Sequence, residues 1–182
     1  TLWSFRVNPA TVPVPQSPHY KFDHKGAIVC GALLGHAEPF LVVDADTAIL
    51  NDPWPLLQPL AGECIAMPRD EGALGEFIGG TKIEKRNAGV MWFGGGARAE
   101  LVREYRAAMQ MLLLNVYKEE RRLYEQLAWN IVCQFRGAPF LPRELNWPDH
   151  FPAVGPNPAA AICHRIGHKK FRPPVSAARP TP

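Results

Sequence analysis

Short apolar runs and stretches with helical spacing follow one another along the chain and predict a mixture of strands and helices. Residues 40–43 form a continuous apolar run, which is typical of a strand buried on both faces inside a parallel or mixed sheet. Residues 20–36 carry apolar side chains at helical spacing, and Asp52 before Pro53 is a typical start for a short helix over residues 53–60. The other predicted strands are residues 2–7, 63–67, 89–93, 140–141 and 160–164.

Two long helices are predicted in the second half of the chain, over residues 97–117 and 119–135, because apolar side chains recur there every three or four positions. The polar, glycine-rich stretch 70–86 predicts a mobile loop. Because strands and helices alternate early in the chain, the pattern predicts an α/β fold. A single domain over residues 1–171 and a proline-rich tail over residues 172–182 complete the predicted organisation.

Composition narrows the class of protein without indicating a function. Apolar residues make up 47% of the 182 positions and charged residues 20%, which excludes a wholly disordered chain and a coiled coil. The 19 prolines, about twice the usual share, argue against a helical bundle. The net charge of +3, without a dense block of lysine and arginine, argues against a nucleic-acid partner.

The sequence also bears on the compartment. No apolar run reaches the roughly 18 residues that a bilayer crossing needs, so we predict no transmembrane segment and expect a cytoplasmic protein. The four cysteines are widely spaced and form no CxxC pair, which predicts reduced core thiols rather than a disulfide or a metal site. Reduced thiols fit a reducing compartment. These cysteines are Cys30, Cys64, Cys133 and Cys163.

The strongest local signal for chemistry is a pair of acids directly after the predicted strand 40–43. Asp44 and Asp46 are two positions apart, and side chains at this spacing in a strand share one face. We therefore expect both to project from the carboxyl edge of the sheet, where open α/β sheets bind ligands. Two neighbouring carboxylates repel unless a cation lies between them, and hard divalent ions prefer oxygen ligands. The alternative is a turn in which the two acids cap Thr47 and Ala48.

This stretch resembles the nucleotide-sugar-dependent glycosyltransferases of the GT-A fold, in particular family 8, the glycogenin and galactosyltransferase group. In that family the two acids bind a metal that neutralises the diphosphate of the donor. The resemblance implies that Asp44, Ala45 and Asp46 lie against the donor, with Asp44 and Asp46 as ligands of Mn²⁺ or Mg²⁺. It also implies the GT-A architecture, which is a central mixed sheet flanked by helices.

A second segment matches the family. Asn87-Ala88-Gly89 resembles its N-[AS]-G-V segment beside the donor sugar, where an asparagine amide both donates to and accepts from hydroxyls and a glycine lets the backbone come close. Asp70 resembles the acid that precedes this segment and faces the sugar. The alternative for residues 87–89 is a plain turn that leads into the next strand.

A third match lies on the helix predicted over residues 119–135. Glu125 and Gln126 resemble the Asp-Gln pair of the family, and Asn130 resembles the asparagine that follows it. Gln126 and Asn130 are four positions apart and therefore share a helical face. The resemblance makes Gln126 and Asp70 the catalytic candidates that orient the sugar, whereas the alternative for the helix is a solvated polar face.

The fourth match is the segment 164–170, which resembles the H-x-x-G-x-x-K signature of the family. The resemblance makes His164 the third metal ligand and assigns Gly167 and Lys170 to the diphosphate. An imidazole completes a site of two acids, and a lysine adds a point charge to phosphate oxygens. The alternative is a basic surface patch. By its position on the helix before the metal strand, Lys25 is a further candidate contact to phosphate or sugar.

Together the four matches cover residues 20–170 and imply metal-dependent transfer of a sugar from a nucleotide diphosphate donor to a hydroxyl acceptor. We expect a UDP-sugar as the donor, and the resemblance implies retention at the anomeric carbon. The chain begins at Thr1, and only 43 residues precede the acid pair, fewer than this fold normally places there. We therefore expect a chain that lacks, or has rebuilt, part of its N-terminal nucleotide-binding half. The sequence gives no oligomeric state.

Two other function classes stay open. Haloacid-dehalogenase-like phosphatases have a strand ending in DxDx[TV], but Thr47 stands one position early here and no later DD or GDxxxD follows. The second class is not an enzyme: it is a sugar-nucleotide or glycan-binding module that has lost catalysis. The short N-terminal part is compatible with this class. Turnover of a UDP-sugar with Mn²⁺, compared with binding alone, separates these classes.

Overall fold

A computed structural model describes residues 20–70, 76–78, 80–115, 124–148 and 157–164. Over these ranges the chain has a mixed α/β fold with four α-helices and three small sheets. The predictions for residues 2–7, for the tail 172–182, and for Gly167 and Lys170 lie outside the described residues.

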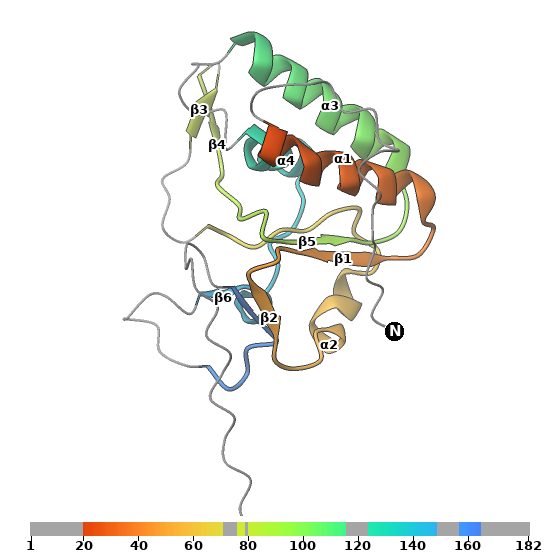
Figure 1. The fold of residues 1–182 in the computed structure, drawn as a ribbon, viewed down its shortest axis with the longest axis vertical. Helices are drawn as coiled ribbons and strands as arrows, with labels where there is room; N and C mark the ends of the chain where they lie inside the picture. Colours follow the sequence, from red (N-terminus) through yellow and green to blue (C-terminus); the bar gives the residue numbers. More distant parts are fainter. Residues whose placement is uncertain (1–19, 71–75, 79, 116–123, 149–156, 165–182) are drawn as a thin grey trace, which may run out of the picture.

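A two-stranded antiparallel ribbon lies at the centre of the fold (Figure 1). Three long helices lie on one side of it, and on the other side lie a short helix and a three-stranded sheet in the order β2-β7-β6. The ribbon consists of β1 (Phe40–Val43) and β5 (Val90–Phe93). The helical side consists of α1 (Tyr20–Gly35), α3 (Arg98–Asn115) and α4 (Tyr124–Phe135). The opposite side consists of α2 (Trp54–Leu57), β2 (Thr47–Ile49), β6 (Trp147–Pro148) and β7 (Ile162–His164).

Alternation of side chains along the ribbon creates two separate hydrophobic clusters, because successive residues of a strand point to opposite faces. One face packs against the three long helices, and the other packs against α2 and the three-stranded sheet. The face toward the long helices consists of Phe40, Val42, Met91 and Phe93. The opposite face consists of Leu41, Val43, Val90 and Trp92. The ribbon thus has apolar contacts on both faces, but β1 is only half-buried and pairs antiparallel with β5, whereas the run 40–43 predicts a buried strand inside a parallel or mixed sheet.

The predicted strands over residues 63–67 and 140–141 are wrong as strands. Ala66 forms one antiparallel bridge with Trp92, and Met67 forms one parallel bridge with Phe140. Only the antiparallel bridge from Ala66 reaches β5, and in the described part of the chain the bridges are too short to make the expected central mixed sheet. Prolines next to the two segments limit further strand pairing, because proline has no backbone N–H to donate to a neighbouring strand. The prolines that adjoin the two segments are Pro68, Pro139 and Pro142.

Helical periodicity predicts the long helices correctly, and the short helix predicted over residues 53–60 is α2 followed by a 3₁₀ turn, η2 (Gln58–Leu60). The backbone N–H of Trp54 donates to the carboxylate of Asp52 at 3.0 Å, the contact expected of this side chain, although α2 begins at Trp54 and Pro53 takes the N-cap position. The predicted strands 89–93 and 160–164 contain β5 and β7.

The prediction of a mobile loop over residues 70–86 is wrong for the part that the structure describes. There, β3 (Glu76–Ile78) and β4 (Thr81–Ile83) form an antiparallel hairpin. Gly80 has a φ of 81°, a backbone conformation that glycine adopts without strain. A glycine-rich composition therefore marks the turn of a hairpin here.

All four cysteines carry free thiols, and Cys30, Cys133 and Cys163 are buried. Burial raises the pKa of Cys30 to about 11 and that of Cys133 to about 12, which keeps both thiols protonated at neutral pH. None of the helices that the structure describes combines the length and apolar composition needed to cross a bilayer.

Candidate functional site

The acid pair lies in a tight turn between β1 and β2 rather than on an extended strand. The Asp44 backbone N–H donates to the carbonyl of Gly89 at 2.8 Å, and its carbonyl accepts from the N–H and the hydroxyl of Thr47 at 3.1 and 2.6 Å. Thr47 is thus held by the main chain of Asp44, so the interpretation in which the carboxylates cap this turn is wrong. The reasoning from strand spacing is also wrong, because Ala45 and Asp46 are turn residues.

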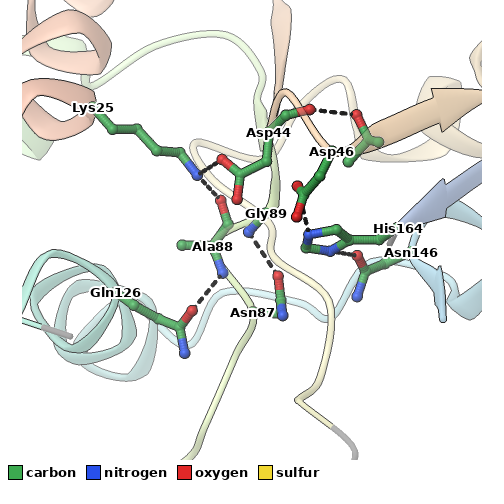
Figure 2. A network of polar contacts seen from close by, with 10 residues as sticks. Lys25, Asp44, Asp46, Asn87, Ala88, Gly89, Gln126, Asn146 and His164 are labelled. Carbon is green, nitrogen blue, oxygen red and sulfur yellow. Dashed lines mark hydrogen bonds and ion pairs between the residues drawn. The ribbon is translucent and has the colours of Figure 1, made fainter. Parts of the chain in front are cut away.

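Two antiparallel pairings meet at this turn and bring a histidine from the far end of the chain to the acids. In the β1–β5 pair Val43 lies opposite Val90, and in the β2–β7 pair Thr47 lies opposite His164. Figure 2 shows the resulting group of side chains. One potential ligand atom each from Asp44, Asp46 and His164 lies within 4.8 Å of the others.

The imidazole of His164 lies between Asp46 and Asn146 (Figure 2). Its Nδ1 is 2.9 Å from Oδ1 of Asn146, and its Nε2 is 3.3 Å from Oδ1 of Asp46. In the tautomer that donates from Nδ1 to this amide oxygen, the lone pair of Nε2 is directed at Asp46.

The protonation of His164 is consistent with this arrangement. Burial lowers the pKa of His164 below its ordinary value, Asp46 and Asp44 oppose this shift, and Lys25 adds to it. The lowered pKa favours the neutral imidazole at pH 7, and in the tautomer with the proton on Nδ1 the Nε2 lone pair would meet the Asp46 carboxylate with repulsion. A cation bound by both atoms would remove that repulsion, so the residues present fit a divalent ion with mixed oxygen and nitrogen ligands.

Helices α1 and α4 hold the loop that faces the acids. Nζ of Lys25 in α1 donates to Oδ1 of Asp44 at 2.5 Å and also to the carbonyl of Ala88. The N–H of Ala88 donates to Oε1 of Gln126 in α4 at 3.2 Å. Lys25 and Gln126 therefore bind the carbonyl and the N–H of the same residue, Ala88, and Lys25 neutralises part of the acid pair.

A second residue of α4 fixes the start of this loop. In the orientation that satisfies both ends of its amide, buried Asn130 donates to the carbonyls of Arg86 and Gln126, each at 3.1 Å, and accepts from the N–H of Arg86 at 3.2 Å. The shared helical face of Gln126 and Asn130 thus contacts backbone and is not the solvated face of the alternative interpretation.

The loop 87–89 lets the imidazole of His164 come close to its backbone. Oδ1 of Asn87 accepts from the N–H of Gly89 at 2.7 Å, so this side-chain oxygen serves the loop itself. A Cβ at position 89 would lie 1.9 Å from Cε1 of His164. Only glycine therefore lets the imidazole reach its place beside the acids.

The remaining candidates from the sequence are not among the ligand atoms that converge in the described part of the chain. The N–H of Asp70 donates to the carbonyl of Lys85 at 3.1 Å, and among the residues that the structure describes its carboxylate makes no contact with the acid pair. Glu125 is half-buried in the first turn of α4, directly before Gln126. Ala45 is exposed in the turn. The donor-binding roles of these residues stay predictions of the sequence.

Two polar residues of the site region were not singled out as site residues by the sequence. Asn146 is buried and holds the imidazole, yet nothing in the sequence around it distinguishes it from a loop asparagine. Arg86 is buried, donates to the carbonyls of Pro139 and Ala138 at 2.7 Å each, and stacks 3.9 Å from the ring centroid of Phe140. Arg86 therefore anchors the 87–89 loop to the segment that leads toward Asn146.

Comparisons with known proteins give one distant structural similarity. No model of a known protein family matches the chain, and no curated protein matches it. One similar solved structure is that of the galactosyltransferase LgtC in complex with donor and acceptor sugar analogs, at 15% sequence identity and a TM-score of 0.46. The match covers 81% of this chain and 61% of that one, so the chain spans less than two thirds of that protein. The function of the chain therefore has to be argued from its own side chains.

Proposed function

We propose that the chain transfers a sugar from a nucleotide diphosphate donor to a hydroxyl acceptor, with a divalent cation held by Asp44, Asp46 and His164. The observation that carries this proposal is the convergence of three ligand atoms, from two distant parts of the chain, within 4.8 Å of one another. The order of the four sequence matches supports it separately, because none of those matches depends on the coordinates.

The charges of the site suit an anionic diphosphate. With neutral His164, the two carboxylates and Lys25 carry one negative charge in sum (two negative, one positive). A bound Mn²⁺ or Mg²⁺ would supply positive charge opposite the oxygens of the leaving diphosphate. The occupied site would then carry net positive charge.

In the proposed reaction the bond between the anomeric carbon and the diphosphate oxygen breaks and a bond to the acceptor oxygen forms. The products are the glycosylated acceptor, a nucleoside diphosphate and the proton of the acceptor hydroxyl. Lys25 already contacts Asp44 and would add its charge to the diphosphate. Gln126 and Asp70 are proposed to orient the sugar, and the 87–89 loop to offer backbone and amide groups to its hydroxyls.

Binding and turnover together test the proposal. We expect UDP with Mn²⁺ to raise the melting temperature by roughly 5–10 °C at a hundredfold excess over Kd, because a ligand of the native state stabilises it by mass action. UDP without the ion, and UMP with it, should shift the melting temperature much less, since the cation is proposed to bind the diphosphate. A UDP-sugar with Mn²⁺ should then release UDP, and nuclear magnetic resonance of the product tests retention at the anomeric carbon.

The other function classes make different predictions for the same samples. A binding module would show the Mn²⁺-dependent thermal shift without release of UDP. A phosphatase would hydrolyse a simple phosphomonoester, which a glycosyltransferase leaves intact. Absence of any thermal shift with a series of nucleoside diphosphates and Mn²⁺ would contradict the proposed function.

A further inference from the structure

Asn146 is a buried polar side chain placed against the proposed metal-binding histidine by the backbone. It directly follows the 3₁₀ turn η4 (Arg143–Leu145), where its N–H donates to the carbonyl of Arg143 at 2.9 Å, and directly precedes β6. Because β6 pairs parallel with β7, with Pro148 opposite His164, the amide reaches Nδ1 of His164 at 2.9 Å. Asn146 is only 9% exposed, so solvent competes little for this hydrogen bond.

We propose that Asn146 is a positioning residue that sets the tautomer of His164. By accepting from Nδ1–H, it leaves Nε2 unprotonated and directed at Asp46, which is the form that binds a divalent cation. The partner on the far side of a ligating imidazole commonly fixes both the tautomer and the orientation of the ring. The metal part of this inference rests on the proposed function, but the tautomer of His164 is defined in the protein without metal.

An amide performs this task without changing the charge of the site. A carboxylate at position 146 would also accept from Nδ1–H, but it would add a third negative charge beside Asp44 and Asp46. Asn146 orients the ring and leaves the net charge to the two acids, Lys25 and the cation.

A purely structural arrangement is the competing possibility. If the amide of Asn146 turned over, it would donate to Nδ1, and Nε2 would carry the proton and donate to Asp46. His164 would then link Asn146 and Asp46 as a closed hydrogen-bonded chain, with no lone pair left for a cation. The two arrangements differ in which ring nitrogen carries the proton.

Two readouts on the full chain test the role of Asn146. Long-range ¹H–¹⁵N correlation spectra of histidine-labelled, metal-free protein give the tautomer of His164, whose signals are assigned by their loss in His164→Gln. Titration calorimetry gives the affinity for Mn²⁺ alone. The wild-type ring should carry its proton on Nδ1 and bind Mn²⁺.

Asn146→Leu removes the acceptor at similar volume. It should shift His164 toward the Nε2–H tautomer, which can donate to Asp46, and weaken Mn²⁺ binding by roughly 10- to 100-fold. Asn146→Asp restores an acceptor and should keep both the tautomer and the Mn²⁺ affinity within a few-fold of wild type. If Asn146→Leu fails to fold, Asn146→Ser, which is smaller and places its hydroxyl farther from the ring, gives the same comparison.

The matched control is Asn51→Leu. Asn51 donates to the carbonyls of Pro158 and Ala160 at 3.2 and 2.7 Å and so supports the same sheet without touching His164. This variant should lower the melting temperature but leave the tautomer and the Mn²⁺ affinity unchanged.

Each outcome separates the inference from the proposed function. An Nε2–H tautomer in the wild type, or an Asn146→Leu variant with unchanged tautomer and Mn²⁺ affinity, overturns the role of Asn146 while the cation site stands. A wild type with the Nδ1–H tautomer that Asn146→Leu alters, but without Mn²⁺ binding, supports the positioning role and contradicts the proposed cation site.

Discussion

Asp46→Asn is expected to abolish Mn²⁺-dependent turnover while leaving the fold intact. The change removes one negative charge and replaces the carboxylate, whose Oδ1 lies 3.3 Å from Nε2 of His164, by a neutral amide, which is a weaker ligand of a hard divalent ion. Loss of several kcal/mol of charge stabilisation corresponds to a fall of roughly 10²- to 10³-fold in kcat. Turnover of a UDP-sugar at saturating Mn²⁺ measures this effect.

The stability of the metal-free variant should change little or rise slightly. The Asp46 side chain is 44% exposed, and its charge repels that of Asp44, so the substitution removes a repulsion and leaves no buried group unpaired. Asp52→Asn is the control, because an asparagine at this exposed position keeps the cap on the N–H of Trp54. Undiminished activity of Asp46→Asn would refute the role of this acid in binding the cation.

Gly89→Ala should remove Mn²⁺ binding by displacing the histidine. The new Cβ would lie 1.9 Å from Cε1 and 2.6 Å from Nδ1 of His164, and 2.7 Å from Oδ1 of Asn87. Neither neighbour gives way easily, because the ring is only 4% exposed and bonded to Asn146, and the Asn87 oxygen accepts from the N–H of residue 89. We expect a loss of about 1–3 kcal/mol of stability from overpacking and a Mn²⁺ affinity too weak to measure by calorimetry.

A second substitution separates the steric effect from a general loss of structure. In the variant Gly89→Ala with His164→Ala the clash with the ring is gone and only the contact with Oδ1 of Asn87 at 2.7 Å remains, so Gly89→Ala should cost less stability in this background than in the wild type, still without Mn²⁺ binding. Gly31→Ala in α1 is the control glycine, since a Cβ there meets nothing within 4 Å. It should stabilise the helix by roughly 0.5–1 kcal/mol and leave Mn²⁺ binding unchanged. Full Mn²⁺ affinity in Gly89→Ala would show that the ring need not occupy this place.

Local sequence patterns predict the elements that have either a helical periodicity over many residues or a strongly apolar run. The helices α1, α3 and α4 and the strands β1 and β5 follow from this, because each buries an apolar face or run against the same core. The position of the acid pair after β1 also follows, whereas its turn conformation depends on the hydrogen bonds between Asp44 and Thr47.

The parts that the sequence does not predict depend on pairings between distant segments. β2 and β6 have three and two residues, too few to produce a periodic pattern. The contact between Asn146 and His164 depends on the parallel pairing of β6 with β7, and the contact of Lys25 with the Ala88 carbonyl depends on how α1 packs. Local propensity carries no information on either arrangement.

In the proposed site, the imidazole of His164 and the carboxylates of Asp44 and Asp46 bind the same cation. Electron spin-echo envelope modulation of Mn²⁺ added to the wild-type chain tests it most directly, because this method detects nitrogen nuclei bound to the ion. We expect one tightly bound Mn²⁺ per chain with the modulation of a directly coordinated imidazole nitrogen, which disappears in His164→Gln. Stoichiometric Mn²⁺ without nitrogen coupling, or no tightly bound Mn²⁺ at all, would contradict it.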